Sequence, residues 1–316
     1  MQWLYFALAG YALLAFVAIG DRLLLASSTV KPARYVFLIG IMGGAVSGLI
    51  FLAHKLLPAA SFLNFLLPEN ALYVFGSALA AGGFYALALL SYFSVLNKVE
   101  ASRVVPTIGA FIPIFSFVFS VIFLGDWLNL LQMIAFSMLV AGSFLLTLEL
   151  GSMKAFYLRN IPILLLSSLI FSIYYLLSKS VYKTLPFWQS IALIQLGLFL
   201  AAVIISLVFR GASQNKEGTL LTFSPKQFFV FVNEFFGAIS IGLIQYAIYL
   251  GSVVLVNALQ GVQYAVLFIS LILLRPFFGK LLAEKWSFGV VIQKFIGIML
   301  IIAGIVLISF AANHAI

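Results

Sequence analysis

Ten stretches of about twenty mostly apolar residues follow one another along this 316-residue chain, and they limit its fold more than any other feature. A helix of roughly 20 residues crosses the hydrocarbon core of a bilayer, and it satisfies its own backbone hydrogen bonds there. The pattern therefore predicts an all-α polytopic membrane protein with ten transmembrane helices. The stretches lie near residues 3–27, 34–54, 71–96, 101–124, 128–148, 161–180, 187–209, 228–250, 257–279 and 288–311.

The composition excludes most other classes of protein. Charged residues make up 8% of the chain, against about 25% in soluble domains, and dense polar alternation typical of an outer-membrane barrel is missing. The chain has no cysteine, which excludes disulfides, cysteine-ligated metals and thiol catalysis. The formal charge of +9 comes from basic residues near span ends, a distribution typical of anchoring beside anionic lipids rather than of nucleic-acid binding. No basic segment precedes the first stretch, so we expect a span rather than a cleaved signal peptide.

The chain divides into two halves, residues 1–150 and 151–316, whose sequences echo each other. Five spans per half is an odd number, so the second half must enter the membrane in the opposite sense. We therefore expect two inverted five-helix repeats within one membrane domain. The paired segments are Ala135–Gly142 with Gly297–Gly304, and Leu124-Gly125-Asp126 with Leu282-Ala283-Glu284.

Three segments of the first half carry a family resemblance. They are Glu100-Ala101-Ser102-Arg103-Val104-Val105-Pro106, the run from Pro113 to Ser120, and Leu124-Gly125-Asp126. Together they resemble the signature of the drug/metabolite transporter superfamily, EamA-like branch. The resemblance implies a ten-helix transporter that works by alternating access, often in efflux, in a bacterial inner membrane. The second half departs from the signature, since Asn257-Ala258 stands where Ala-Ser is usual. In the first half, Asp126 stands for the usual glutamate.

The distribution of basic residues and the resemblance predict opposite orientations. Of the 17 Lys and Arg residues, only Lys55, Lys179 and Lys183 lie at connections after even-numbered spans. The positive-inside rule then makes the odd connections cytoplasmic and both termini external. The resemblance implies cytoplasmic termini. We favour the charge distribution, and impermeant labelling of cysteines introduced at Ser213 and Ser61 would decide between the two.

Polar side chains inside the spans are the candidates for a solute site, because an unpartnered polar group in hydrocarbon is costly. Tyrosines near span ends have the alternative role of interfacial anchors, and glutamines that of hydrogen bonding between helices. Lys179 is expected to extend to the interface, and Asp21 to pair locally with Arg22. The predicted substrate-binding residues are Tyr85, Tyr92, Arg103, Thr107, Tyr175, Gln245, Tyr246, Tyr249, Asn257, Gln260, Gln263 and Tyr264.

Two of the candidates carry charge and have specific expected roles. Glu234 lies about two turns inside the eighth span, so it is the candidate carboxylate for binding a coupling proton or cation. The alternative is that Glu234 is a capped residue at the membrane interface. Arg103 shares a helix face with Thr107, and its rigid fork of donors suits a carboxylate or phosphate. The alternative for Arg103 is a topological arginine facing the cytoplasm.

Catalytic and nucleotide-binding motifs are absent from the sequence. No Gly-Lys-Ser phosphate loop, no histidine with metal-ligand partners and no Ser/His/Asp arrangement occurs, so we expect no enzyme, no cofactor and no bound metal.

We predict a secondary active or facilitative transporter of a small organic metabolite that is amino acid-like, zwitterionic or amphipathic. The alternatives are a flippase for an amphipathic headgroup and a non-transporting scaffold or channel. The expected partners are the solute and the lipid bilayer, with no nucleic acid, and both a monomer and a homodimer remain open.

Overall fold

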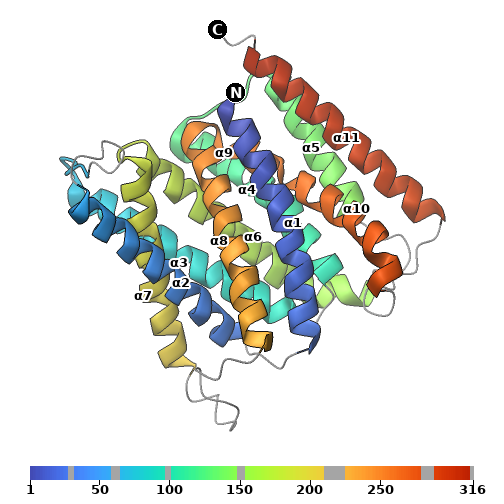
Figure 1. Cartoon of the computed structure of the whole chain (residues 1–316). Helices are drawn as coiled ribbons and strands as arrows, with labels where there is room; N and C mark the ends of the chain where they lie inside the picture. The colour runs from blue at the N-terminus through green and yellow to red at the C-terminus, as the bar shows by residue number, and fades with distance from the viewer. Residues whose placement is uncertain are drawn as a thin grey trace.

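A computed structural model of the chain describes residues 1–27, 32–57, 65–96, 101–147, 154–209, 225–278 and 288–313. Within these ranges the regular structure is helical throughout, without strands (Figure 1). The first half forms α1 (Gln2–Ser27), α2 (Pro32–Leu56), α3 (Ala71–Leu96), α4 (Ala101–Phe119), a π-helical turn η2 (Ser120–Leu124) and α5 (Leu130–Thr147). The second half forms α6 (Lys154–Tyr182), α7 (Phe187–Val208), α8 (Pro225–Leu250), α9 (Val253–Ala258), α10 (Gln260–Phe278) and α11 (Phe288–Asn313).

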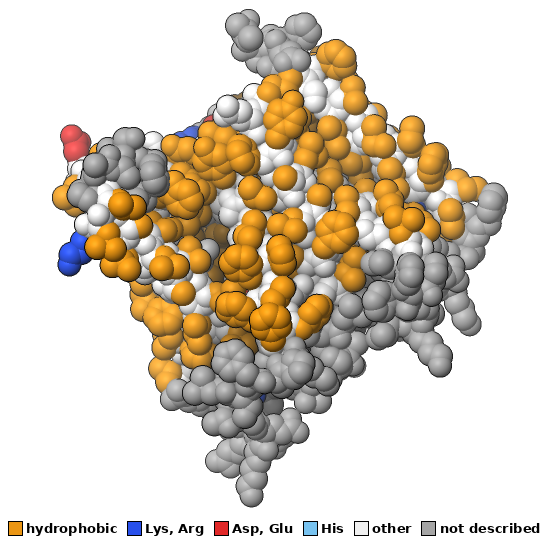
Figure 2. Space-filling model, in the orientation of Figure 1, with side chains coloured by type: hydrophobic (Ala, Val, Ile, Leu, Met, Phe, Trp, Pro, Cys, Tyr) orange, Lys and Arg blue, Asp and Glu red, His pale blue; other side chains and the backbone are white. Residues whose placement is uncertain are grey.

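The described part of the chain contains nine helices that are long and apolar enough to cross a membrane, and α5 contributes a shorter apolar stretch, Leu130–Leu146. Large apolar side chains cover the outside of the bundle, with Leu72 91% and Leu130 79% exposed. On the face drawn in Figure 2 they spread across the described helices, and charged side chains are few. A soluble monomer rarely exposes apolar patches of this extent, whereas lipid accommodates them. The chain is an all-helical, multi-pass integral membrane protein.

The ninth predicted stretch, 257–279, differs from the observed helices. The helical segment begins earlier, at Val253, and a tightened turn at Leu259 separates α9 from α10. There the Leu259 amide donates to the carbonyl oxygens of Leu255 and Val256, and the Val262 amide donates to that of Leu259. Bonds that reach back only three residues belong to a 3₁₀ turn, so the chain stays hydrogen-bonded while its direction changes.

The fourth predicted stretch ends in an unusual helix terminus. After the π-helical turn, Gly125 adopts a left-handed conformation with φ of 66°, and its amide donates to the Ser120 carbonyl. Glycine has no Cβ to clash in this conformation, so it ends the helix without strain. The Leu124-Gly125-Asp126 segment is thus a helix stop that directs Asp126 toward Lys183, with 3.5 Å between the carboxylate oxygen and Nζ.

Two helix pairs are packed closely through small residues. Ser240 of α8 donates to the Gly10 carbonyl of α1 at 2.7 Å, and a Cβ at Gly10 would lie 2.8 Å from Ile244. A Cβ at Gly40 of α2 would overlap the Ala202 Cβ of α7. Without a hydrophobic driving force between helices in lipid, such close approach is a main source of helix association. α1–α8 and α2–α7 are therefore two tightly joined units.

The two units lie side by side, and α2 does not run packed along α1 or α8. Within the described ranges, α2 packs along α7 and α3 and makes few contacts with α1 or α8. Figure 1 shows α2 and α7 on one side of the bundle, α1 and α8 across its centre, and α5 with α11 on the opposite side. The face in Figure 2 is hollowed between α8 and the α2–α7 unit.

Candidate functional site

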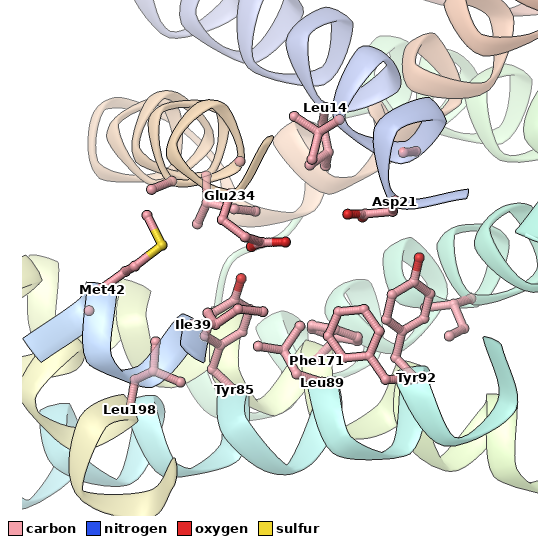
Figure 3. Close-up of a pocket in the computed structure, with 18 of the residues that line it drawn as sticks. Leu14, Asp21, Ile39, Met42, Tyr85, Leu89, Tyr92, Phe171, Leu198 and Glu234 are labelled. Atoms are coloured by element: carbon pink, nitrogen blue, oxygen red, sulfur yellow. The ribbon is translucent and has the colours of Figure 1, made fainter. Parts of the chain in front are cut away.

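A cavity of about 160 Å³ lies between the two units. Residues of α1, α2, α3, α4, α6, α7, α8 and α10 line it, whereas the α5–α11 pair contributes none of its described lining. Tyr85, Phe171 and Tyr92 form one wall, and Asp21 and Glu234 extend into the space from the opposite side (Figure 3). Helices from both halves of the chain therefore line the cavity.

The polar groups of the cavity are acidic or neutral. Asp21 of α1 and Glu234 of α8 are its carboxylates, and none of the described lining residues is Lys, Arg or His. Gln195, Gln260 and Gln263 add side-chain amides. The Oε1 atoms of Gln195 and Gln263 are buried and have no hydrogen-bond partner among the described residues. A buried acceptor without a donor is rare, so each of these oxygens would gain a hydrogen bond if a solute or water in the cavity reached it.

One tyrosine connects the two carboxylates. The Tyr35 hydroxyl, from the first turn of α2, lies 2.9 Å from Asp21 Oδ1 and also contacts Glu234 Oε1. Asn233 of α8 donates to the same Asp21 oxygen at 2.7 Å. The Tyr35 ring is 3% exposed and packs edge-on against Phe93 of α3, with 4.5 Å between the centroids. This cluster joins α1, α2, α3 and α8 beside the cavity.

The structure brings six of the thirteen predicted site residues to the cavity. Glu234 lines it, and so do five of the twelve predicted substrate-binding residues: Tyr85, Tyr92, Tyr175, Gln260 and Gln263. They come from α3, α6, α8 and α10, so the fold gathers residues that are far apart in the sequence.

Three predicted site residues of α8 lie in a separate aromatic cluster outside the cavity lining. Tyr246 and Tyr249 pack against Phe187 of α7, with centroid distances of 4.9 and 5.5 Å. Gln245 is 1% exposed, accepts a hydrogen bond from the Tyr182 hydroxyl at 2.9 Å, and contacts the Tyr174 hydroxyl. These contacts join the C-terminal end of α8 to α6 and α7.

The remaining candidates lie where α4 meets the ninth-span segment. Asn257 is fully buried and donates to Ser116 of α4 at 2.8 Å. Tyr264 is buried so close to Gly109 of α4 that a Cβ there would overlap its hydroxyl. Thr107 is buried on α4 and is not among the lining residues. Arg103 belongs to α4, but its side chain lies outside the described residues.

Sequence reasoning missed three polar residues of the site: Asp21, Tyr35 and Gln195. Asp21 was interpreted as half of a local pair with Arg22, whose side chain is outside the described residues; in the structure its partners come from α2 and α8. An acidic residue before the end of an apolar span was the available signal, since such a group needs a partner in lipid. No comparable signal marked Tyr35, because it stands in the first turn of its helix.

The carboxylate pair could hold a proton or a monovalent cation. Among the described residues, no group of three or more His, Cys, Asp or Glu side chains is arranged to hold a metal ion. Two carboxylates bridged by a phenol hydroxyl leave too few ligands for the six to eight oxygens that calcium prefers.

Comparison with known proteins supports the fold and names no function. No protein-family model and no curated protein matches this chain. A solved crystal structure matches with a TM-score of 0.66 and 17% sequence identity, covering 99% of this chain and 96% of its own. The chain therefore shares its overall helical fold with a protein of known structure.

Proposed function

We propose that this protein is a secondary active or facilitative transporter that moves a small organic solute by alternating access. The observation that carries the proposal is the cavity between the α1–α8 and α2–α7 units, with two carboxylates and unpartnered amide oxygens inside an otherwise apolar bundle. Ionisable groups at such a position are costly in a membrane and mark solute or ion pathways.

Reciprocal contacts support two inverted five-helix repeats, the architecture that the proposal needs. If Ala135–Gly142 corresponds to Gly297–Gly304, a twofold axis that relates them converts a 142–297 contact into a 304–135 contact. Both occur: a Cβ at Gly142 would lie 2.7 Å from the Gly297 carbonyl, and one at Gly304 would lie 3.1 Å from the Ala135 carbonyl. Likewise, extensive α1–α8 packing is matched by extensive α3–α6 packing. Inverted repeats of this kind support rocking about a central site.

Membership of the drug/metabolite transporter superfamily, EamA-like branch, is part of the proposal. It is supported by the helix stop at Leu124-Gly125-Asp126, where glycine takes the left-handed conformation. The proposal further expects a bacterial inner membrane location, with export as the direction of transport.

The charges of the cavity favour a solute that carries an amine. The described lining offers carboxylates and amide oxygens as acceptors and no basic side chain for a carboxylate or phosphate. The rings of Tyr85, Tyr92 and Phe171 add an aromatic wall that can face an ammonium group or an apolar part of the solute. Zwitterionic, amphipathic and other amine-bearing metabolites therefore fit better than dicarboxylates or sugar phosphates.

A flippase for an amphipathic headgroup is the second candidate, because the cavity reaches the gap between α2 and α8. Met42 of α2 and Ala238 of α8 line the cavity, and Ala238 is exposed. A solute that keeps its tail in lipid could enter through this gap.

Counterflow in proteoliposomes tests transport directly. Vesicles preloaded with a pool of unlabelled amines and amino acids should take up labelled members of the same pool in a saturable manner. Protein-free vesicles and vesicles with heat-inactivated protein are the controls. Linear, non-saturable flux would indicate a channel, and movement of fluorescent lipid without solute counterflow would indicate the flippase.

A further inference from the structure

The hydrogen bonds of the Asp21–Tyr35–Glu234 cluster require more protons than its phenol carries. A tyrosine hydroxyl has one hydrogen and can donate to one acceptor. Tyr35 nevertheless contacts a carboxylate oxygen on each side, Asp21 Oδ1 at 2.9 Å and Glu234 Oε1. One of the two contacts therefore needs a hydrogen that a carboxyl group supplies, or the two oxygens would face each other without a donor.

The surroundings decide which carboxyl group carries that hydrogen. Asp21 Oδ1 already accepts a hydrogen bond from Asn233 at 2.7 Å, as an ionised carboxylate does. Tyr35 supplies a second donor to the same oxygen. Among the described residues Tyr35 is the one hydrogen-bond partner of Glu234, so a proton on Glu234 that is donated to the Tyr35 oxygen completes the chain. In this arrangement Asp21 is ionised and Glu234 is protonated.

We propose that Asp21, Tyr35 and Glu234 form a proton-binding site that holds the α2–α7 unit against the α1–α8 unit. A proton on Glu234 completes the hydrogen-bond chain between the units and closes the cavity beside it. Release of the proton leaves two carboxylates facing one hydroxyl, and their repulsion separates the units. The proposal deepens the proposed transport function by naming what regulates the cavity, but its tests below do not require transport.

The packing makes Tyr35 the link between the two units on the side of Asp21 and Glu234. Each unit is joined internally by helix contacts too close for a Cβ, at Gly10 in one and at Gly40 in the other. Between the units, by contrast, α2 makes few contacts with α1 or α8 among the described residues. The Tyr35 hydroxyl therefore bridges the two units near the N-terminal half of α8, and its ring is anchored on Phe93. The packing of Tyr246 and Tyr249 on Phe187 joins the units at the other end of α8, so a separation at Tyr35 would pivot about that end.

The other groups that face the cluster leave Glu234 as the site of proton exchange. Tyr85 and Tyr92 of α3 and Tyr175 of α6 are the other titratable side chains of the described lining. A phenol is neutral across the physiological range, so these groups stay uncharged when Glu234 titrates. The polar lining groups of α7 and α10 are amides, and α4 adds apolar side chains. Arg34, which precedes Tyr35, is the nearby basic residue of α2.

Distance measurements between spin labels test the link, and the absence of native cysteines makes the labelling specific. Labels at I41C and F235C lie on exposed positions of α2 and α8. We expect a short, narrow distance distribution at acidic pH and a longer one at alkaline pH. The E234Q and D21N variants should keep the short distance at every pH, because a carboxamide supplies the missing donor. Y35F should show the long distance at every pH.

Y35F and the two carboxamide variants should change the distance in opposite directions. General damage to the fold would change it in the same direction in all three variants. The matched control is E69Q, because Glu69 is an acidic residue that is exposed outside the spans. This variant should retain the full pH response. A distance that does not change with pH in the parent protein would overturn the proposal. A distance that changes when sodium replaces choline at constant pH would also overturn it, since the site would then bind a metal cation rather than a proton.

Difference infrared spectroscopy provides a readout that does not depend on labels. Near neutral pH, the parent protein should show the carbonyl band of a protonated carboxyl group, and E69Q should show it unchanged. E234Q should lose the band. A spectrum of the parent without such a band would contradict a protonated Glu234. If counterflow fails while both of these tests succeed, the proton site stands and only the proposed transport function falls.

Discussion

Lys179 of α6 donates a hydrogen bond to the carbonyl oxygen of Gly251, 2.7 Å away, immediately after the end of α8. Its Nζ also reaches the carbonyl oxygens of Ile248 at 2.8 Å and Tyr249 at 3.4 Å. The last carbonyls of a helix lack intrahelical partners and carry partial negative charge. Lys179, expected from the sequence to extend to the interface, instead caps the C-terminal end of α8.

We therefore predict that Lys179→Met lowers the free energy of unfolding by about 1–3 kcal/mol, the usual cost of leaving partly buried acceptors without a charged donor. Thermal unfolding in detergent, followed by circular dichroism, measures the change. Lys183→Met is the matched control, because its ion pair with Asp126 is exposed and should contribute no more than about 1 kcal/mol. Equal effects of the two substitutions would contradict the capping role.

The contact between α5 and α11 predicts that the stability of the protein depends strongly on glycine at position 142. A Cβ added at Gly142 would lie 2.7 Å from the Gly297 carbonyl, so Gly142→Ala must push the two backbones apart. We expect a loss of about 1–3 kcal/mol in unfolding free energy, as for other overpacked sites. Gly76→Ala in α3 is the control, since nothing lies within 4 Å of its added Cβ, and its stability should be unchanged or slightly higher.

The unpartnered amide oxygens of the cavity predict which residues determine solute affinity. Gln195→Leu and Gln263→Leu each remove a buried acceptor from the lining, and loss of a hydrogen bond to a charged amine costs about 1.5–3 kcal/mol. We expect a roughly tenfold or greater rise in the half-saturation concentration for counterflow.

Gln132→Leu is the control for these substitutions, because Gln132 lies in the first turn of α5, outside the cavity lining, where its exposed hydrogen bonds are with Asn129. Solute affinity should be unchanged in this variant. If the cavity variants match it, the two amide oxygens do not contact the solute.

Gln245 was a predicted substrate contact, and its surroundings predict a different result. Its side chain joins Tyr182 to Tyr174 inside the bundle and does not line the cavity. Gln245→Met should therefore lower the thermal stability and leave the half-saturation concentration unchanged. The same measurement on Tyr182→Phe, which removes one of the two hydrogen bonds, should show a smaller loss of stability. A change in solute affinity without loss of stability would return Gln245 to the binding site.

The positions of the helices were predictable because they depend on local sequence. Length and apolar character decide whether a segment crosses lipid, and the observed helices begin and end within a few residues of most predicted stretches. There are two exceptions. The helix α6 begins at Lys154, seven residues before the predicted stretch at 161–180. At α9 and α10, the turn at Leu259 cannot be detected by counting apolar residues. Glu234 was recognisable for the same local reason, as a carboxylate well inside an apolar stretch.

The sequence alone determined which segments are helical and apolar, and which polar side chains they carry, because these properties are set by residues close together in the chain. Only the tertiary structure decided which of those polar groups meet. Asp21 and Tyr35 are 14 residues apart, and Tyr35 and Glu234 are 199 apart, so their contact depends on how α1, α2 and α8 rotate and pack. Packing likewise turned Gln245, Tyr246 and Tyr249 into an aromatic cluster outside the cavity lining, because a small rotation of a helix changes the partners of every side chain on it.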